Sequence, residues 1–86
     1  MAKIHALKTV DPYFSMTKNG MKTFELRKND RDFAEGDLLI LQHWIEEEKR
    51  FTGDQIVKKI DFVLSDFKGL SKGYVILQIS DVKVSW

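Results

Sequence analysis

The segment GMKTFELRKND, from Gly20 to Asp30, alternates between apolar and polar residues as a β-strand does, yet it carries charges of both signs. Phe24 and Leu26 share one face of such a strand, and Glu25 and Arg27 share the other. A small domain builds its core from apolar side chains. The simplest interpretation is therefore that Glu25 and Arg27 lie on the face that points away from the core.

The residues before this segment carry the signals of a strand followed by a short helix. KIHALKTV, Lys3–Val10, alternates like a first strand. Asp11 is a good N-cap, Pro12 suits the first helical position, and Gly20 suits the left-handed residue that ends a helix. These signals predict a helix from Pro12 to about Asn19, with the side chains of three residues buried: Tyr13, Phe14 and Met16.

The residues after this segment are typical of further strands. AEGD, residues 34–37, reads as a turn, and LLILQHW, Leu38–Trp44, is the most apolar strand. An acidic connection, residues 45–54, leads to a strand over Gln55–Ser65, in which Ile60, Phe62 and Leu64 are in step. A Gly-containing loop then precedes a final strand or two over Gly73–Val84.

These elements predict one domain over residues 1–86, with a mainly β fold that has one early helix (α+β). The tally is about five strands without the strand–helix alternation of a parallel sheet. Chains of this size with this pattern usually curl into a small antiparallel or mixed barrel, because closure removes exposed strand edges. An open sheet packed under the helix is the rival arrangement.

Composition excludes several classes of protein. The chain has 86 residues, 43% of them hydrophobic, and no cysteine, which rules out disulfides, thiolate catalysis and Cys-based metal sites. Two distant histidines, His5 and His43, fit no metal-ligand spacing, so we expect neither a metal nor a cofactor. No segment approaches the ~20 apolar residues of a membrane span. We expect a soluble cytoplasmic protein with a net charge of +1, which gives no global basic field.

The charged residues around the central strand also suggest a ligand site. Glu25 and Arg27 project in parallel about 7 Å apart along a strand. Lys22 has the opposite parity and joins them only if the chain bends near Gly20 or its long stem reaches round. A Lys, a Glu and an Arg at a barrel mouth suit a small anionic ligand, because the cations bind phosphate and the carboxylate accepts the amino edge of a base. Lys18 and Arg31 are weaker supporting cations.

The pattern G-x-K-x-x-E-x-R, formed by Gly20, Lys22, Glu25 and Arg27, resembles the signature of ASCH domains, a family in the PUA-like superfamily of small β-barrels. The resemblance extends to the preceding helix, the KNDRDFAEGD segment and the closing GYVILQI strand. The sequence looks closest to short stand-alone bacterial and phage members without an assigned function. The resemblance implies a PUA-like barrel with a cleft beside the helix that binds RNA or a nucleotide.

Two catalytic alternatives come from the same resemblance. Some ASCH-like proteins hydrolyse an acetylated cytidine nucleoside with a threonine at the position of Glu25, and this departure argues against that activity here. Others are ribonucleases, for which candidate groups are available in this chain: Lys22, Glu25, Arg27, Tyr74 and His5. Lys22 and Glu25 are the candidates for a metal-independent reaction. His5 and His43, however, are more often ordinary strand residues.

Two non-catalytic alternatives depend on other features: RNA binding on aromatic residues, and protein binding on an edge strand. Single-stranded RNA is held by cations along its backbone and by aromatic rings under its bases. Tyr74 is the aromatic assigned to the site beside the charged residues, and other stacking candidates, most of them expected in the core, are Tyr13, Phe33, Trp44 and Phe51. The acidic run Glu46–Glu48 repels nucleic acid, so we expect the binding face to lie away from the loop that carries it. A module that binds a protein partner through an edge strand, with a vestigial cleft, remains a third class.

Overall fold

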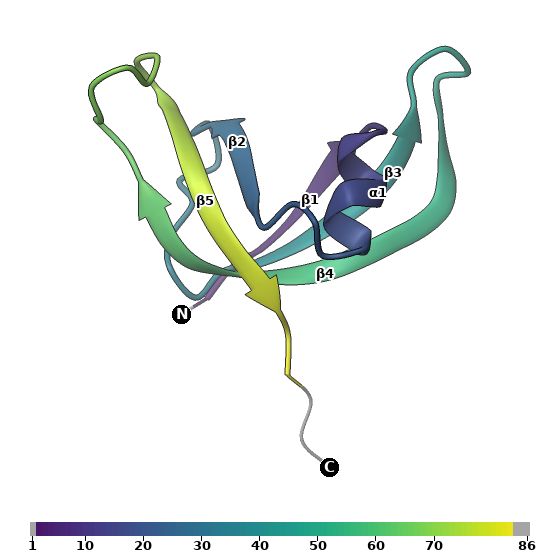
Figure 1. Cartoon of the computed structure of the whole chain (residues 1–86), viewed down its shortest axis with the longest axis horizontal. Helices are drawn as coiled ribbons and strands as arrows, with labels where there is room; N and C mark the ends of the chain where they lie inside the picture. The colour runs from purple at the N-terminus through teal and green to yellow at the C-terminus, as the bar shows by residue number, and fades with distance from the viewer. Residues whose placement is uncertain (1, 84–86) are drawn as a thin grey trace.

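The computed structural model describes residues 2–83 and contains six regular elements (Figure 1). They are β1 (Ile4–Thr9), α1 (Tyr13–Lys18), β2 (Phe24–Lys28), β3 (Leu38–Ile45), β4 (Arg50–Leu64) and β5 (Tyr74–Asp81). A mainly β fold with one early helix and five strands is thus confirmed. The end of the predicted last strand, Val84, and Trp86, which ends the chain, lie outside the described residues.

The five strands form one curled, half-barrel sheet in the order β1-β3-β4-β5-β2. β1 pairs with β3 in parallel and the three other pairs are antiparallel, so the sheet is of the mixed kind. β4 is the longest strand and curves through the whole molecule, pairing with β3 and β5 along its length (Figure 1). Figure 1 also shows α1 beside β1 and β3, within the hollow of the curled sheet.

The sheet ends in two strands, β1 and β2, that no strand pairing joins within residues 2–83. Two arginine side chains cross this seam instead. Arg27 Nη2 donates to the carbonyl oxygen of Lys8 at 3.0 Å, and Arg31 Nη1 donates to the carbonyl oxygen of Ala6 at 2.8 Å. Main-chain acceptors of β1 are therefore satisfied by side chains rather than by a sixth strand.

The core lies inside the curl of the sheet. β3, β4 and β5 contribute most of it, and β1 and α1 add one large side chain each: the buried apolar residues are Leu7, Phe14, Phe33, Leu39, Leu41, Ile60, Val75, Leu77 and Ile79. Alternate residues of β5 are buried, which is the period expected for a strand with one covered face. Burial of this apolar surface is the main term that holds so small a domain together.

Four sequence-based expectations are corrected by the structure. Ile60 is not in step with Phe62 and Leu64, because an irregularity in β4 between Ile60 and Phe62 leaves Ile60 buried and turns Phe62 to the outer side. The inner face of β2 is the charged one, since Glu25 is 4% exposed whereas Leu26 is 54% exposed. Of the three residues predicted to be buried in the helix, Phe14 is buried but Tyr13 is exposed. β4 begins at Arg50 and not at Gln55, because a tight turn after Ile45 lets the two strands pair directly.

The expectation about membranes is tested only in part. No helix within residues 2–83 is long and apolar enough to cross a bilayer. The cytoplasmic location stays a prediction.

Candidate functional site

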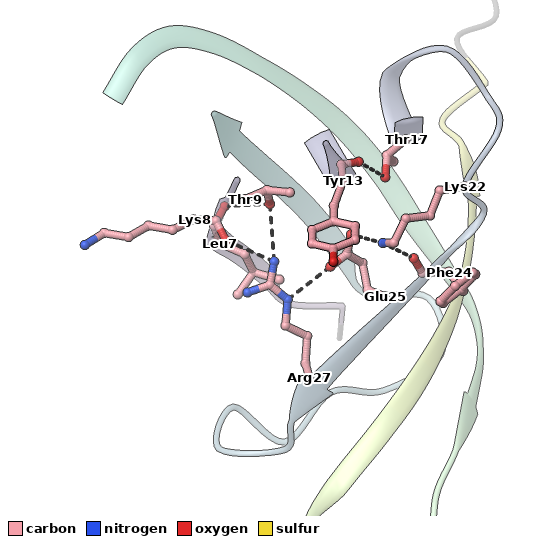
Figure 2. Close-up of polar contacts among 9 residues, drawn as sticks. All are labelled: Leu7, Lys8, Thr9, Tyr13, Thr17, Lys22, Phe24, Glu25 and Arg27. Atoms are coloured by element: carbon pink, nitrogen blue, oxygen red, sulfur yellow. Dashed lines mark hydrogen bonds and ion pairs between the residues drawn. The ribbon is translucent and has the colours of Figure 1, made fainter. Parts of the chain in front are cut away.

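Glu25 accepts hydrogen bonds from two cations on the inner face of β2 (Figure 2). Lys22 Nζ donates to Oε1 at 2.9 Å, and Arg27 Nε donates to Oε2 at 3.1 Å. The Glu25 side chain is 5% exposed and the Lys22 side chain 10% exposed. Each carboxylate oxygen therefore has a charged partner that offsets its loss of water, and the structure brings the three predicted site residues together.

Lys22 reaches Glu25 because the chain between α1 and β2 is not a strand. Gly20 has a φ of 85°, a left-handed conformation that ends α1 and turns the chain. The Lys22 N–H then donates to the carbonyl of Met16 at 3.0 Å, which holds the segment against the helix. The Lys22 ammonium also donates to the carbonyl of Phe24 at 2.5 Å. Strand parity therefore does not apply to Lys22, and its stem turns inward.

Arg27 links the site to the opposite end of the sheet. Besides its contact with Glu25, its Nη2 donates to the Lys8 carbonyl at 3.0 Å and to Thr9 Oγ1 at 3.2 Å. The guanidinium thus spans from β2 to β1 (Figure 2). Its side chain is 25% exposed, so part of it still faces solvent. Thr9 is a partner that sequence reasoning missed. The signal available was the alternation of β1, which places Thr9 on the same face as the buried Leu7.

A cleft of about 540 Å³ opens above these three residues. It lies between the end of β1, α1 and β2, and its walls are mostly apolar or aromatic: Val10, Tyr13, Met16, Met21, Phe24 and Leu26. The Tyr13 ring extends from α1 toward Glu25 (Figure 2). Two cations against one carboxylate give the polar end of the cleft a formal charge of +1. An apolar slot with a positively charged end favours a ligand with a flat apolar part and an anionic part.

The weaker site candidates take other positions. Lys18 Nζ contacts Asp54 Oδ2 at 2.6 Å. Arg31 is bound to β1 across the seam. Tyr74 pairs with Lys28 and therefore lies on the outer face of the sheet, opposite to Glu25. None of these three residues lines the cleft.

The two histidines have structural partners. His5 Nε2 lies 2.9 Å from Asp37 Oδ2, and both side chains are buried. His43 lies 3.1 Å from Asp11 through Nε2 and 3.1 Å from Thr52 through Nδ1, and its ring stacks on Phe14 at 4.7 Å. His43 therefore attaches α1 to β3. Within residues 2–83 no three His, Asp or Glu side chains are grouped to hold a metal ion.

Asp11 is a partner of His43 and accepts hydrogen bonds from the first turn of α1, although Pro12 and not Asp11 occupies the predicted N-cap position. Its Oδ1 accepts from the Ser15 hydroxyl at 2.7 Å and from the Ser15 N–H at 2.9 Å. These two hydrogen bonds, with a smaller contribution from His43, hold the pKa of Asp11 below its usual value. The helix that forms one wall of the cleft is thus fixed at its start by an ionised side chain.

Two comparisons place the chain among known proteins. Residues 4–79 match the model of a family described as "Domain of unknown function (DUF3850)". The chain is also similar to the "Uncharacterized 12.9 kDa protein in GpA 3'region" of Escherichia phage P2. The two are 39% identical over 77 residues, which are 90% of this chain and 68% of the phage protein.

Proposed function

The chain belongs to the DUF3850 family of domains, and we propose that its cleft binds a nucleotide or a short single-stranded RNA. One observation carries the proposal: a buried carboxylate sits between two cations at the end of an apolar cleft. Purely structural ion pairs are commonly placed on the surface or sealed in a core. Here the group faces a space of about 540 Å³, the size range of small-ligand sites.

Each part of such a ligand has a matching group in the cleft. A base stacks on the Tyr13 ring or against the apolar wall, because every base offers a π-face. The Glu25 carboxylate accepts from the amino edge of the base, as carboxylates do with cytosine. Arg27 and Lys22 attract a phosphate, and the planar guanidinium gives that attraction geometry.

The finer family assignment belongs to the same proposal. The residues Gly20, Lys22, Glu25 and Arg27 are the ones that resemble the ASCH signature, and they surround the cleft or turn the chain into it. A curled five-strand sheet with one helix beside the cleft is compatible with a PUA-like barrel. We propose that DUF3850 domains of this kind are PUA-like, with the cleft as their shared RNA or nucleotide site.

A hydrolase acting on the bound ligand is the second candidate. The 2.9 Å contact between Lys22 and Glu25 favours it, because it joins a proton donor and a carboxylate base at the polar end of the cleft. Such a reaction proceeds without added metal and is lost in Glu25→Gln. Binding without turnover supports the first candidate.

The test is a titration of the isotope-labelled protein with the four nucleoside monophosphates and a ten-nucleotide single-stranded RNA, followed by backbone NMR. We expect shifts around residues 22–27 and at α1. Arg27→Gln is expected to weaken binding about tenfold, because a charge-assisted contact to phosphate is lost. The control is Arg50→Gln, which removes an arginine paired with Glu48 on the distant β3–β4 hairpin.

Four outcomes separate the candidates. Shifts at the cleft with an intact ligand support the binder, and breakdown of the ligand supports the hydrolase. Shifts elsewhere, or equal losses in Arg27→Gln and Arg50→Gln, contradict the cleft as the site. No shifts with any ligand contradict both candidates and make a protein partner the leading idea. Unfolding curves are recorded for each variant, so that binding is compared only between folded proteins.

A further inference from the structure

The outer side of β2, β5 and β4 is apolar, and no other element within residues 2–83 covers it. Because residues paired across antiparallel strands point to the same face, the register places six such residues together: Phe24, Leu26, Phe62, Leu64, Tyr74 and Ile76. We call these six residues the outer apolar face. Phe24 and Phe62 are both 47% exposed, and Tyr74 is 40% exposed. A group of this kind on the surface of a small protein marks an interaction site.

From this surface we infer a second contact region for nucleic acid: the outer apolar face is a stacking platform for a single-stranded RNA that leaves the cleft. The inference rests on the proposed function and extends it from one nucleotide to a strand. Phe24 and Phe62 both flank Gln78, two strand spacings or roughly 10 Å apart.

The platform is continuous with the cleft. Phe24 and Leu26 lie at the boundary, since both line the cleft although they belong to the outer side of β2. The Lys22 ammonium, which holds Glu25, is also 4.9 Å from the centre of the Phe24 ring. A strand with one base in the cleft therefore meets the Phe24 ring as it passes over β2.

Charge favours a polyanion over an apolar protein partner. Lys28, Lys68 and Lys72 have no acidic partner within residues 2–83, whereas most other lysines do. All three lie at the Tyr74 end of the platform: Lys28 pairs with Tyr74, and the β4–β5 loop carries the other two. Against them the loop has one acid, Asp66. Cations beside exposed rings are the pattern that holds single-stranded RNA.

The experiment compares Phe62→Ala with Phe51→Ala. Phe51 is 45% exposed and packs on Trp44 at the far hairpin, so the two changes remove equal rings from different places. Affinity is measured for the ten-nucleotide RNA by anisotropy and for nucleoside monophosphates by calorimetry. We expect Phe62→Ala to weaken RNA binding about tenfold and Phe51→Ala to change it less than twofold, because each stacked base is lost with its ring. Phe62→Tyr is expected to retain binding.

The remaining measurements distinguish a failure of the platform from a failure of the proposed cleft function. Monophosphate binding is expected to be the same in all three variants. Lys28→Gln is expected to lower the salt slope of RNA affinity by about one. RNA that binds no tighter than a monophosphate, or equally to Phe62→Ala and wild type, overturns the platform and leaves the cleft intact. A wild-type dimer that Phe62→Ala dissociates overturns it in favour of a second copy of the chain. Absence of binding by every ligand overturns the platform and the cleft function together.

Discussion

Two buried carboxylates, Glu25 and Asp37, are held in opposite ways. Asp37 accepts from the backbone N–H groups of Lys3 and Ala34, both at 3.0 Å, and from His5 at 2.9 Å. Within the described part of the chain, Glu25 accepts only from the long side chains of Lys22 and Arg27. One carboxylate is thus tied to main chain within the fold, and the other to side chains that line a cleft.

The difference separates a structural carboxylate from a candidate functional one. The donors of Asp37 are Lys3 just before β1, His5 on β1 and Ala34 in the loop before β3, so the carboxylate fixes the start of the sheet. Backbone donors do not move without moving a strand. The donors of Glu25 are side chains, which change position without displacing a strand, and they are the groups that would contact an anionic ligand. Burial alone therefore does not distinguish the two roles, whereas the identity of the donors does.

The largest effect is expected for Asp37→Ala. This change leaves the Lys3 and Ala34 N–H groups and the His5 ring without their acceptor inside the fold, and unpaired buried donors are costly. We expect the free energy of unfolding to fall by about 4 kcal/mol, measured by urea denaturation. A loss below about 1 kcal/mol would contradict a structural role for Asp37.

A smaller loss is expected for Glu25→Gln. The amide still accepts a hydrogen bond, but Lys22 and Arg27 lose their counter-charge, and both keep some exposure to water. We expect a loss of about 2 kcal/mol. Adding Lys22→Met to this variant is expected to recover part of the loss, because one unpaired cation is removed. Additive losses in the double variant would show that the ion pair is not coupled.

The stability that Asp37 contributes is expected to depend on pH. Burial tends to raise the pKa of this carboxyl, but hydrogen bonds from Lys3, His5 and Ala34 hold it below the ordinary 3.8. A carboxyl with a lowered folded-state pKa adds stability above its unfolded pKa, and that stability is lost as the pH falls through the folded pKa. Unfolding free energy should therefore fall below about pH 3.8, less steeply in Asp37→Asn. Identical acid limbs in the two proteins would contradict this assignment.

The smallest effect is expected on the outer side of the strand that carries Glu25. Leu26 is 54% exposed, so Leu26→Gln removes little buried apolar surface. We expect a change within about 0.5 kcal/mol, against the larger loss for Glu25→Gln next to it. Thermal unfolding of the two variants under the same conditions measures this inversion of the usual apolar-in, polar-out pattern. A greater loss for Leu26→Gln would mean that the apolar side of β2 is the covered one.

Local signals predicted the elements, but contacts between distant residues decided the faces. Asp11, Pro12 and Gly20 predicted a helix within a residue of its observed ends at Tyr13 and Lys18. The two-residue period of β2 does not show which of its two faces is buried. The charged face is expected in solvent because unpaired charges are costly to bury. The ion pair with Lys22 offsets the cost of burying the Glu25 charge. This pair forms because the chain bends at Gly20, and the two-residue period of a strand gives no sign of that bend.

The sequence predicted that the three charged residues lie together, but not that Arg27 connects β2 to β1. Lys22, Glu25 and Arg27 were found from their spacing and the signature they resemble. The contacts of Arg27 with Lys8 and Thr9 join residues 18 or more positions apart, and no local pattern encodes them. The pairing of His5 with Asp37, 32 positions away, is hidden for the same reason.

The arginines that cross the seam between β1 and β2 also bear on how the protein behaves at high concentration. An open strand with free carbonyls is a template on which another chain adds a strand, and such growth leads to aggregates. Arg27 and Arg31 occupy the carbonyls of Lys8 and Ala6, so that this template is blocked by charge and bulk. A substitution of Arg27 therefore also frees the Lys8 carbonyl at this edge, so that the colloidal stability of the protein is tied to the residue that we propose for ligand recognition.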